Sequence, residues 1–265
     1  KEIKNNEYRV GLTPSSAYEL IHAGHQIIVE MGAGLGIGYS DKNYTEIGAV
    51  IAATPQEVFS KSQLIVKVKE PLAQERAYLN RSHTLFTYLH LAPDPEQTDD
   101  LLKSGSTCIA YETVTDKDGH LPLLTPMSEV AGRMSIQAGA HCLEKSQQGQ
   151  GLLLSGVPGV PSANVVILGG GVVGANAAKI AVGMGANVFI LDTSLNTLRN
   201  LDHSFGNKIK TLLSTKHSIE SSLRIADLVI GAVLLPGAKA PKLVSRTDLK
   251  LMKPGAAIVD VAVDQ

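Results

Sequence analysis

A glycine-rich turn between two apolar runs constrains the fold of this chain more than any other stretch. Residues 164–168 (NVVIL) form a short, almost wholly apolar run, which predicts a buried strand. The next residues, 169–174 (GGGVVG), fit the spacing G-x-G-x-x-G. A small-residue helix over 175–184 and a second strand over 187–191 follow. This order of elements is typical of a mononucleotide-binding βαβ unit.

The glycines of this turn suit a dinucleotide. Gly169 permits the tight turn, Gly171 lets the backbone approach a pyrophosphate, and Gly174 lets helix and strand pack closely. The N-terminus of the following helix offers backbone N–H groups and the positive end of its dipole to phosphate groups. We therefore predict a dinucleotide site; the alternative is a glycine-rich turn in another α/β fold.

Asp192 predicts which dinucleotide binds. It ends the second strand, 18 residues after Gly174, where a carboxylate can accept hydrogen bonds from the hydroxyls of an adenosine ribose. A 2′-phosphate at this place would meet a like charge. The sequence therefore predicts NAD in preference to NADP.

Composition excludes several classes of protein. Hydrophobic residues make up 44% of the 265 residues and charged residues 18%, which is typical of a globular chain. The net charge of −1 gives no electrostatic reason to expect nucleic acid or an anionic membrane as partner. Cys108 and Cys142 are too few for a disulfide framework or a thiolate zinc site, and we predict no metal. No apolar stretch is long enough to cross a membrane, so we predict a cytoplasmic protein.

Strands alternate with helices along the whole chain, which predicts an α/β fold. We expect two Rossmann-like domains, each with a mostly parallel doubly wound sheet, and an active-site cleft between them. The expected bounds are 1–126 for a substrate domain, 127–148 for a linking helix and 149–265 for an NAD-binding domain. In the first domain the pattern predicts strands over 26–31, 64–68, 84–89 and 107–111, helices over 14–23, 44–51, 54–60 and 95–103, and a surface turn over 32–38.

Polar residues at strand ends are candidate catalytic groups, because ligands of open α/β sheets bind beyond the carboxyl ends of the strands. Lys69 and His90 follow strands of the first half, Asp192 and Asp264 follow strands of the second, and Arg9 lies in the irregular N-terminal segment. A guanidinium can hold a carboxylate with two hydrogen bonds, and an ammonium can polarise a carbonyl or imine. An imidazole can carry a proton near neutral pH. The alternatives are a structural histidine and a lysine that only solvates a strand end.

Eight short motifs carry a resemblance to a known family. They are 5–10 (NNEYRV), 67–71 (KVKEP), 85–92 (LFTYLHLA), 110–113 (AYET), 126–133 (PMSEVAGR), 156–160 (GVPGV), 237–241 (GAKAP) and 260–265 (DVAVDQ). In combination they resemble the L-alanine dehydrogenases, which form one family with the NAD-binding component of transhydrogenases. The resemblance covers essentially the whole chain.

The resemblance implies an activity and roles for four residues. The activity is the NAD-dependent oxidative deamination of L-alanine to pyruvate and ammonium, together with the reverse reductive amination. Arg9 would hold the substrate carboxylate, and Lys69 would hold the carbonyl or amino end. His90 would be the general acid/base, and Asp264 would position or activate the water that hydrolyses the imine.

The same resemblance implies a larger set of contacts with NAD. Ser128 would contact a phosphate, and Ser214, Val233 and Leu234 would line the adenine and nicotinamide sides. Where a relative carries a basic residue after the ribose aspartate, this chain has Thr197. The expected cofactor contacts are Ser128, Gly169, Gly171, Val172, Val173, Gly174, Asp192, Thr197, Ser214, Val233, Leu234, Val261, Ala262, Val263 and Asp264.

The resemblance also bears on length and assembly. Family members continue well past residue 265, and a doubly wound dinucleotide domain usually has one parallel strand more than is predicted here. We therefore expect the functional protein to extend beyond Gln265, and we expect a homo-oligomer, by resemblance a hexamer. Two rival hypotheses are the NAD-binding component of a proton-translocating transhydrogenase and a non-catalytic NAD-binding fragment.

Overall fold

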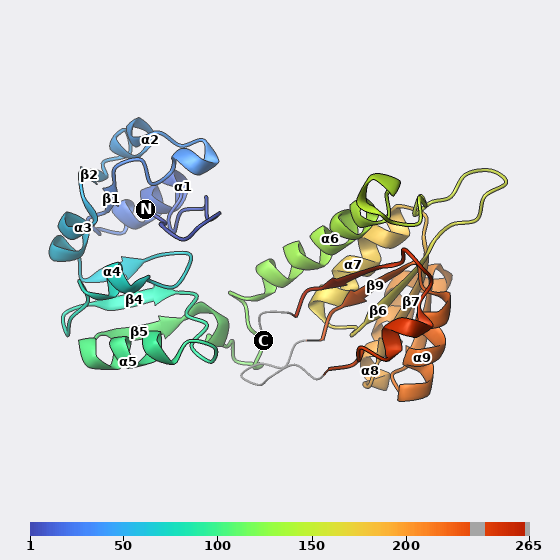
Figure 1. Ribbon diagram of the computed structural model, residues 1–265. Coiled ribbons are helices and arrows are strands. Elements are labelled where there is room, and N and C mark those ends of the chain that lie inside the picture. Colours follow the sequence, from blue (N-terminus) through green and yellow to red (C-terminus); the bar gives the residue numbers. More distant parts are fainter. Residues whose placement is uncertain (234–241, 263–265) are drawn as a thin grey trace. The chain divides into compact units, whose positions relative to one another are not determined.

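The computed structural model describes residues 1–233 and 242–262, and the chain forms two compact units, Lys1–Leu124 and Thr125–Gln265 (Figure 1). The sequence predicts a separate linking helix between its two domains. In the structure this helix, α6 (Thr125–Cys142), lies within the bounds of the second unit. No helix in the described part of the chain is both long and apolar enough to cross a membrane.

The second unit is built on a five-stranded sheet, counted over the described residues, in which every pair of neighbours is parallel. Its strands are β6 (Asn164–Leu168), β7 (Asn187–Asp192), β8 (Ile209–Leu213), β9 (Leu228–Gly231) and β10 (Ala257–Asp260). Their order is β10-β9-β6-β7-β8, so the chain direction across the sheet reverses between β6 and β9. In a doubly wound fold this reversal opens a crevice beyond the carboxyl ends of the two strands.

Helices cover both faces of this sheet. Besides α6 they are α7 (Val172–Gly183), α8 (Leu195–Phe205) and α9 (Lys216–Ile225). Side chains alternate between the faces of a strand, so Val165 and Ile167 of β6 join a core with α6, α7 and α8. Val166 and Leu168 join a second core with α9. The doubly wound architecture predicted for this half is therefore confirmed.

Helix α6 approaches α7 unusually closely. A Cβ on Gly132 would lie 2.2 Å from the backbone oxygen of Val173, so only glycine fits at this crossing. The helix predicted over 175–184 begins earlier, at Val172, because Gly171 is its N-cap. The long helix ends at Cys142, and a short 3₁₀ turn, η3 (Lys145–Gln147), follows.

The first unit is also α/β with parallel strands. Its described strands pair as β1 (Ile28–Glu30) with β2 (Val50–Ala52), and as β3 (Leu64–Val66), β4 (Thr84–Thr87) and β5 (Thr107–Ala110) in one three-stranded sheet. Its helices are α1 (Pro14–His22), α2 (Asp41–Thr45), α3 (Pro55–Lys61), α4 (Ala73–Arg76) and α5 (Pro95–Ser104), with 3₁₀ turns η1 (Leu35–Ile37) and η2 (Tyr111–Thr113). The predicted α/β class with parallel sheets is confirmed in this unit too.

The helix predicted over 44–51 is wrong beyond Thr45. The capping box of Ser40 and Asn43 begins α2 at Asp41. The helix ends at Thr45. Gly48 then turns the chain at φ 93°, and the β-branched residues that follow form β2 beside β1. The segment predicted as a surface turn, 32–38, packs against the N-terminal segment, since a Cβ on Gly36 would lie 2.6 Å from the oxygen of Tyr8.

Candidate active site

The turn after β6 is tightly packed on two sides and open on the third. Gly169 has φ 103°, and a Cβ there would lie 2.8 Å from the oxygen of Ala232. A Cβ on Gly174 would lie 1.9 Å from the oxygen of Gly169, so helix α7 rests directly on the turn. A Cβ on Gly171 would meet nothing within 4 Å. The turn therefore leaves space where the predicted pyrophosphate would approach the backbone.

The start of α7 carries no side-chain cap. Gly171 is the N-cap in an extended conformation, and no described side chain accepts a hydrogen bond from the first turn of the helix. Val172 is exposed and Val173 is buried. An uncapped helix start presents N–H groups and a positive dipole end, which suit an anion such as a phosphate.

Asp192 is held at the end of β7 by two backbone groups. Its Oδ2 accepts a hydrogen bond from the N–H of Gly170 at 2.7 Å, and its Oδ1 accepts one from the N–H of Ser194 at 2.7 Å. The methyl group of Thr197 lies 3.0 Å from the position of a Cβ on Gly170. The structure thus brings the carboxylate and Thr197 against the glycine turn.

Other predicted cofactor residues lie around the same carboxyl edge of the sheet. A γ-methyl of Val233 lies 3.0 Å from the position of a Cβ on Gly169. The N–H of Ser214 donates to the oxygen of Asp192 at 2.9 Å, and the N–H of Val261 donates to the oxygen of Gly231 at 2.9 Å.

Two further predicted contacts, Ala262 and Ser128, lie among the described residues. Ala262 follows Val261, and its N–H donates to Asp260 Oδ1 at 3.0 Å. Ser128 lies in the first turn of α6. Three predicted contacts, Leu234, Val263 and Asp264, lie outside the described residues.

In the first unit, Arg9 is paired with a carboxylate that sequence reasoning did not single out. Its Nε and one terminal nitrogen donate to the two carboxylate oxygens of Glu7, at 2.8 and 2.6 Å. The hydrogen bonds from Arg9, and to a smaller extent the charge of Lys69, lower the pKa of Glu7 to about 2. The same hydrogen bonds raise the pKa of Arg9. Glu7 is therefore ionised at neutral pH and orients the guanidinium.

Two lysines that follow β3 have different surroundings. Lys67 is buried, and its Nζ lies 2.7 Å from Glu75 Oε1 and 3.2 Å from Glu2 Oε2. Lys69 is half-buried, and its ammonium forms no salt bridge with any residue that the structure describes. Its backbone oxygen accepts a hydrogen bond from Thr87 Oγ1 at 2.9 Å. Lys67 is thus committed to the fold, whereas Lys69 can serve a ligand.

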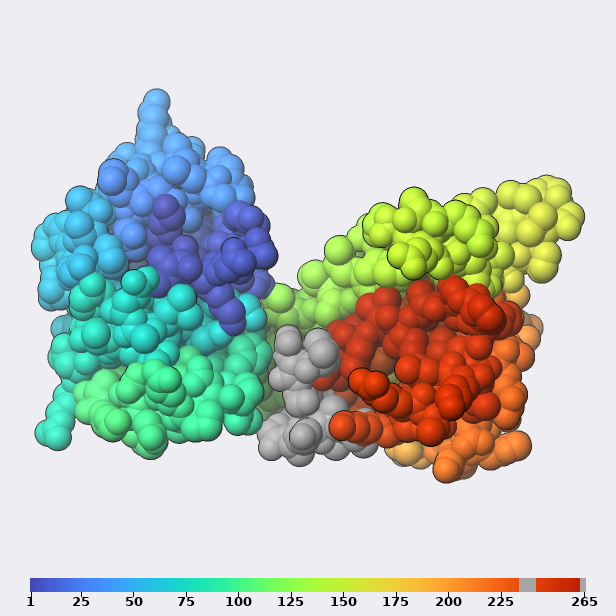
Figure 2. Space-filling view, in the orientation of Figure 1, coloured from blue at the N-terminus to red at the C-terminus, as the bar shows by residue number. Residues whose placement is uncertain are grey.

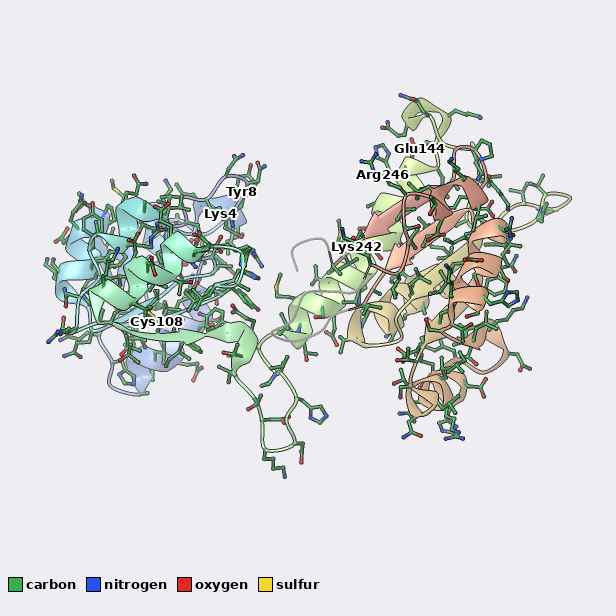
Figure 3. The ribbon with its side chains drawn as sticks, turned by 60° about the horizontal axis from the view of Figure 1, so that its bottom comes forward. Lys4, Tyr8, Cys108, Glu144, Lys242 and Arg246 are labelled. Carbon is green, nitrogen blue, oxygen red and sulfur yellow. The ribbon has the colours of Figure 1, made fainter. Side chains whose placement is uncertain are left out.

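The N-terminal segment is fastened to the first unit by further ion pairs, and it lies on the surface of that unit (Figure 2). Lys4, which Figure 3 labels together with Tyr8, pairs with Glu70. This pair and that of Glu2 with Lys67 hold the segment that carries Arg9 against the end of β3.

His90 follows β4 in a left-handed backbone conformation, φ 48°. Its ring stacks on that of Tyr88, with centroids 6.2 Å apart and planes inclined by 22°. Burial raises the pKa of Tyr88, and the charge of Arg9 opposes that shift, which places Arg9 within electrostatic reach of this tyrosine. The Tyr88 hydroxyl donates to the oxygen of Leu123 at 2.6 Å. The first unit thus gathers Arg9, Lys69 and His90 in one neighbourhood.

Sequence reasoning missed three residues of this neighbourhood, namely Glu7, Tyr88 and Glu112. Tyr88 stands two positions before His90 at the end of the predicted strand, which was a local signal for it. Glu7 had a local signal too, as an acid two positions from Arg9 in an irregular segment. Glu112 contacts His90 across 22 residues of chain and gave no local signal.

Both halves of the chain match one family. Residues 1–131 match Alanine dehydrogenase/PNT, N-terminal domain, and residues 135–265 match Alanine dehydrogenase/PNT, C-terminal domain. Alanine dehydrogenase of Methanococcus maripaludis is 57% identical over 265 residues, which are 100% of this chain and 71% of that protein. A solved structure of L-alanine dehydrogenase is 50% identical with a TM-score of 0.95, covering 100% of this chain and 73% of that chain.

A more distant structure is similar as well. The transhydrogenase from Sinorhizobium meliloti is 28% identical with a TM-score of 0.85, covering 100% of this chain and 77% of that chain. Identity is thus about twice as high to the alanine dehydrogenases as to this transhydrogenase. The family models match nearly every residue. The chain therefore belongs to the alanine dehydrogenase/PNT family.

Proposed function

We propose that this chain interconverts L-alanine with pyruvate and ammonium, using NAD as the hydride acceptor and NADH as the donor. Relatives named alanine dehydrogenase, at over 50% identity along the whole chain, support this activity. The observation that carries it is the first unit's group of Arg9, Lys69 and His90, since these residue types suit an amino or keto acid. NAD, when bound, supplies the hydride chemistry, and the open turn at Gly171 with its uncapped helix fits a pyrophosphate.

Each substrate group has a proposed partner in the first unit. Arg9, oriented by Glu7, holds the carboxylate, and the half-buried ammonium of Lys69 holds the carbonyl or amino end. His90 takes up and returns the proton that accompanies oxidation and reduction. Asp264, outside the described residues, positions or activates the water that hydrolyses the imine.

The proposed NAD contacts belong to the second unit. Asp192 accepts hydrogen bonds from the adenosine ribose, and its charge disfavours a 2′-phosphate. The uncharged side chain of Thr197 beside it adds no cation to attract that phosphate. The remaining proposed contacts are Ser128, the turn from Gly169 to Gly174, Ser214, Val233, Leu234, Val261, Ala262 and Val263.

The rival hypotheses differ in catalysis. A transhydrogenase component passes hydride between nucleotides and has no use for a group that binds an amino acid, and the lower identity to the transhydrogenase disfavours it. A non-catalytic fragment would bind NADH without turnover. An assay of alanine-dependent NAD reduction separates both from the proposed enzyme, because only the proposed enzyme reduces NAD when L-alanine is the sole donor.

His90 provides the first test of the proposed roles. We choose His90→Asn because asparagine tolerates the left-handed backbone at φ 48° but has no group that takes up or releases a proton near neutral pH. Loss of a general acid/base should lower kcat by about a hundred- to ten-thousand-fold, while NADH affinity in a fluorescence titration stays within a few-fold. An equal loss of turnover and NADH affinity would point to a structural histidine instead.

Asp192 provides the second test. Asp192→Asn removes the charge at the proposed ribose site and should narrow the ratio of kcat/KM for NAD over NADP. Asp202→Asn is the matched control, because Asp202 is an exposed residue of α8 with the same charge. If both variants keep the wild-type ratio, the ribose assignment is wrong.

Assembly and location complete the proposal. The family resemblance supports a homo-oligomer, by resemblance a hexamer, and we propose the cytoplasmic location that the sequence predicts. Light scattering of the purified protein measures the oligomeric state, and fractionation of cells measures the location. A monomer at all concentrations would contradict the oligomer.

A further inference from the structure

The backbone at His90 is unusual. It is one of three non-glycine residues with positive φ among the described residues, the others being Asn6 and Gln148. A residue with a side chain keeps this conformation only when its surroundings hold it there, because the left-handed region is sterically disfavoured. A candidate acid/base residue in such a conformation therefore needs a partner that fixes its peptide group.

Glu112 is that partner. It lies in η2, just after β5, and its Oε1 accepts hydrogen bonds from the N–H of His90 at 2.8 Å and from the N–H of Leu89 at 3.1 Å. Its Oε2 lies 3.3 Å from the N–H of Leu89. A single carboxylate thus binds both N–H groups where the chain leaves β4.

Gln97 binds a carbonyl group of the same chain segment. Its side chain is 1% exposed, and its Nε2 donates to the oxygen of Leu89 at 2.6 Å. Both peptide polar groups of Leu89, and the N–H of His90, therefore have side-chain partners. Because the stacked ring of Tyr88 limits the imidazole on one face, the backbone direction at residue 90 decides where the ring nitrogens point.

We propose that Glu112 is a positioning residue, which fixes the left-handed turn at Leu89–His90 and thereby aims the His90 imidazole at the reacting group. The inference rests on the proposed acid/base role of His90. In this role Glu112 must place an acceptor oxygen within hydrogen-bond distance of the two N–H groups, and its negative charge is not required. A misplacement of about 1 Å is enough to lower the rate by about a hundredfold.

Two conservative variants separate the effect of side-chain length from the effect of charge. Glu112→Gln removes the charge but retains a carbonyl oxygen at the place of Oε1, which can accept from both N–H groups. Glu112→Asp retains the charge but is one methylene shorter. We expect Glu112→Gln to keep kcat within a few-fold of wild type and Glu112→Asp to lower kcat by about a hundredfold, with unchanged NADH affinity.

The matched control is Glu57→Asp. Glu57 also lies in the first unit and accepts a backbone N–H, that of Ala53 at 3.1 Å, but its described hydrogen-bond partners include none of the proposed site residues. The same shortening there should leave kcat unchanged. The opposite pattern at residue 112, an active aspartate and an inactive glutamine, would show that charge matters and would overturn the proposal.

A double variant distinguishes this inference from the proposed role of His90. If Glu112 acts through His90, adding Glu112→Asp to His90→Asn should lower kcat no further than His90→Asn alone. If the fall in kcat of the double variant equals the product of the falls in the two single variants, the positioning role is overturned. If His90→Asn alone keeps wild-type turnover, the proposed function of His90 fails, whereas a low kcat for His90→Asn beside an active Glu112→Asp defeats only the inference about Glu112.

Discussion

The two units build their candidate sites from different materials. In the second unit the site is a backbone turn, where Gly169 and Gly174 permit close contacts and the first turn of α7 supplies N–H groups. In the first unit the site is a group of charged and polar side chains, and some of these charges are held by neighbouring carboxylates. Arg9 is held by Glu7, and the neighbouring Lys67 is held by Glu2 and Glu75.

This difference implies different weaknesses. A site made of backbone is insensitive to protonation of side chains, but an added Cβ destroys it. A site made of paired charges tolerates small changes of volume, but loss of one partner leaves a charge without compensation. Substitutions that exploit each weakness should therefore affect one unit and spare the other.

The chain provides a separate probe for each unit. It contains no tryptophan, and all seven tyrosines lie within the first 124 residues. Tyrosine fluorescence therefore reports the unfolding of the first unit alone. NADH fluorescence reports the integrity of the proposed NAD site in the second unit.

The largest loss of stability is expected for Lys67→Met, in the first unit. Lys67 is 6% exposed and bridges two carboxylates, so its loss leaves Glu2 and Glu75 as like charges in a buried place. Removing one member of a buried ion pair costs about 3–5 kcal/mol. The urea midpoint of the tyrosine signal should fall accordingly, while NADH affinity is kept.

Lys61→Met is the control for that experiment. Lys61 pairs with Glu57 on the surface of α3, where solvent screens an exposed ion pair and it contributes little to stability. A similar midpoint for the two variants would show that the buried network does not hold the first unit together.

The second largest effect, a loss of stability and of NADH affinity in the second unit, is expected for Gly174→Ala. Its Cβ would lie 1.9 Å from the oxygen of Gly169, so α7 must move away from the turn. Overpacking of this kind costs about 1–3 kcal/mol, and the displaced turn should bind NADH more weakly. Gly183→Ala, in the same helix with nothing within 4 Å of its Cβ, should keep NADH affinity. Equal affinity of both variants would contradict the backbone account of the NAD site.

The same contrast explains how much the sequence could predict. The glycine turn, β6, β7 and Asp192 lie within 29 consecutive residues, so local pattern was sufficient to place them. The reversal of strand order between β6 and β9 follows from the family of folds that this pattern indicates. The second unit was therefore largely predictable.

The carboxylates that hold Lys67 and His90 in the first unit were not predictable in the same way. The contact of Glu2 with Lys67 spans 65 residues, and that of Glu112 with His90 spans 22. No periodicity or spacing in one sequence signals such pairs, because they form only after the sheet has brought the strand ends together. The helix expected over 44–51 failed for a related reason, since pairing with β1 overrides local helix preference in β2.

The smallest effect concerns the pH dependence of the Glu7–Arg9 pair. The hydrogen bonds from Arg9 lower the pKa of Glu7 from 4.5 to about 2 in the folded chain. A lowered folded-state pKa stabilises the fold above the unfolded pKa, and this contribution is lost as pH falls from about 4.5 to about 2. Because Arg9 is 39% exposed, solvent screening reduces the contribution to about 1 kcal/mol.

Glu7→Gln should therefore lower the free energy of unfolding of the first unit at neutral pH, measured by tyrosine fluorescence in urea. The difference from wild type should shrink as the pH is lowered through this window, because the wild-type carboxylate becomes protonated. Glu57→Gln is the matched control at an exposed pair of the same unit. A difference that stays constant down to pH 2 would mean that Glu7 supports the fold through packing, and the first unit's site would then depend less on charge than its contacts indicate.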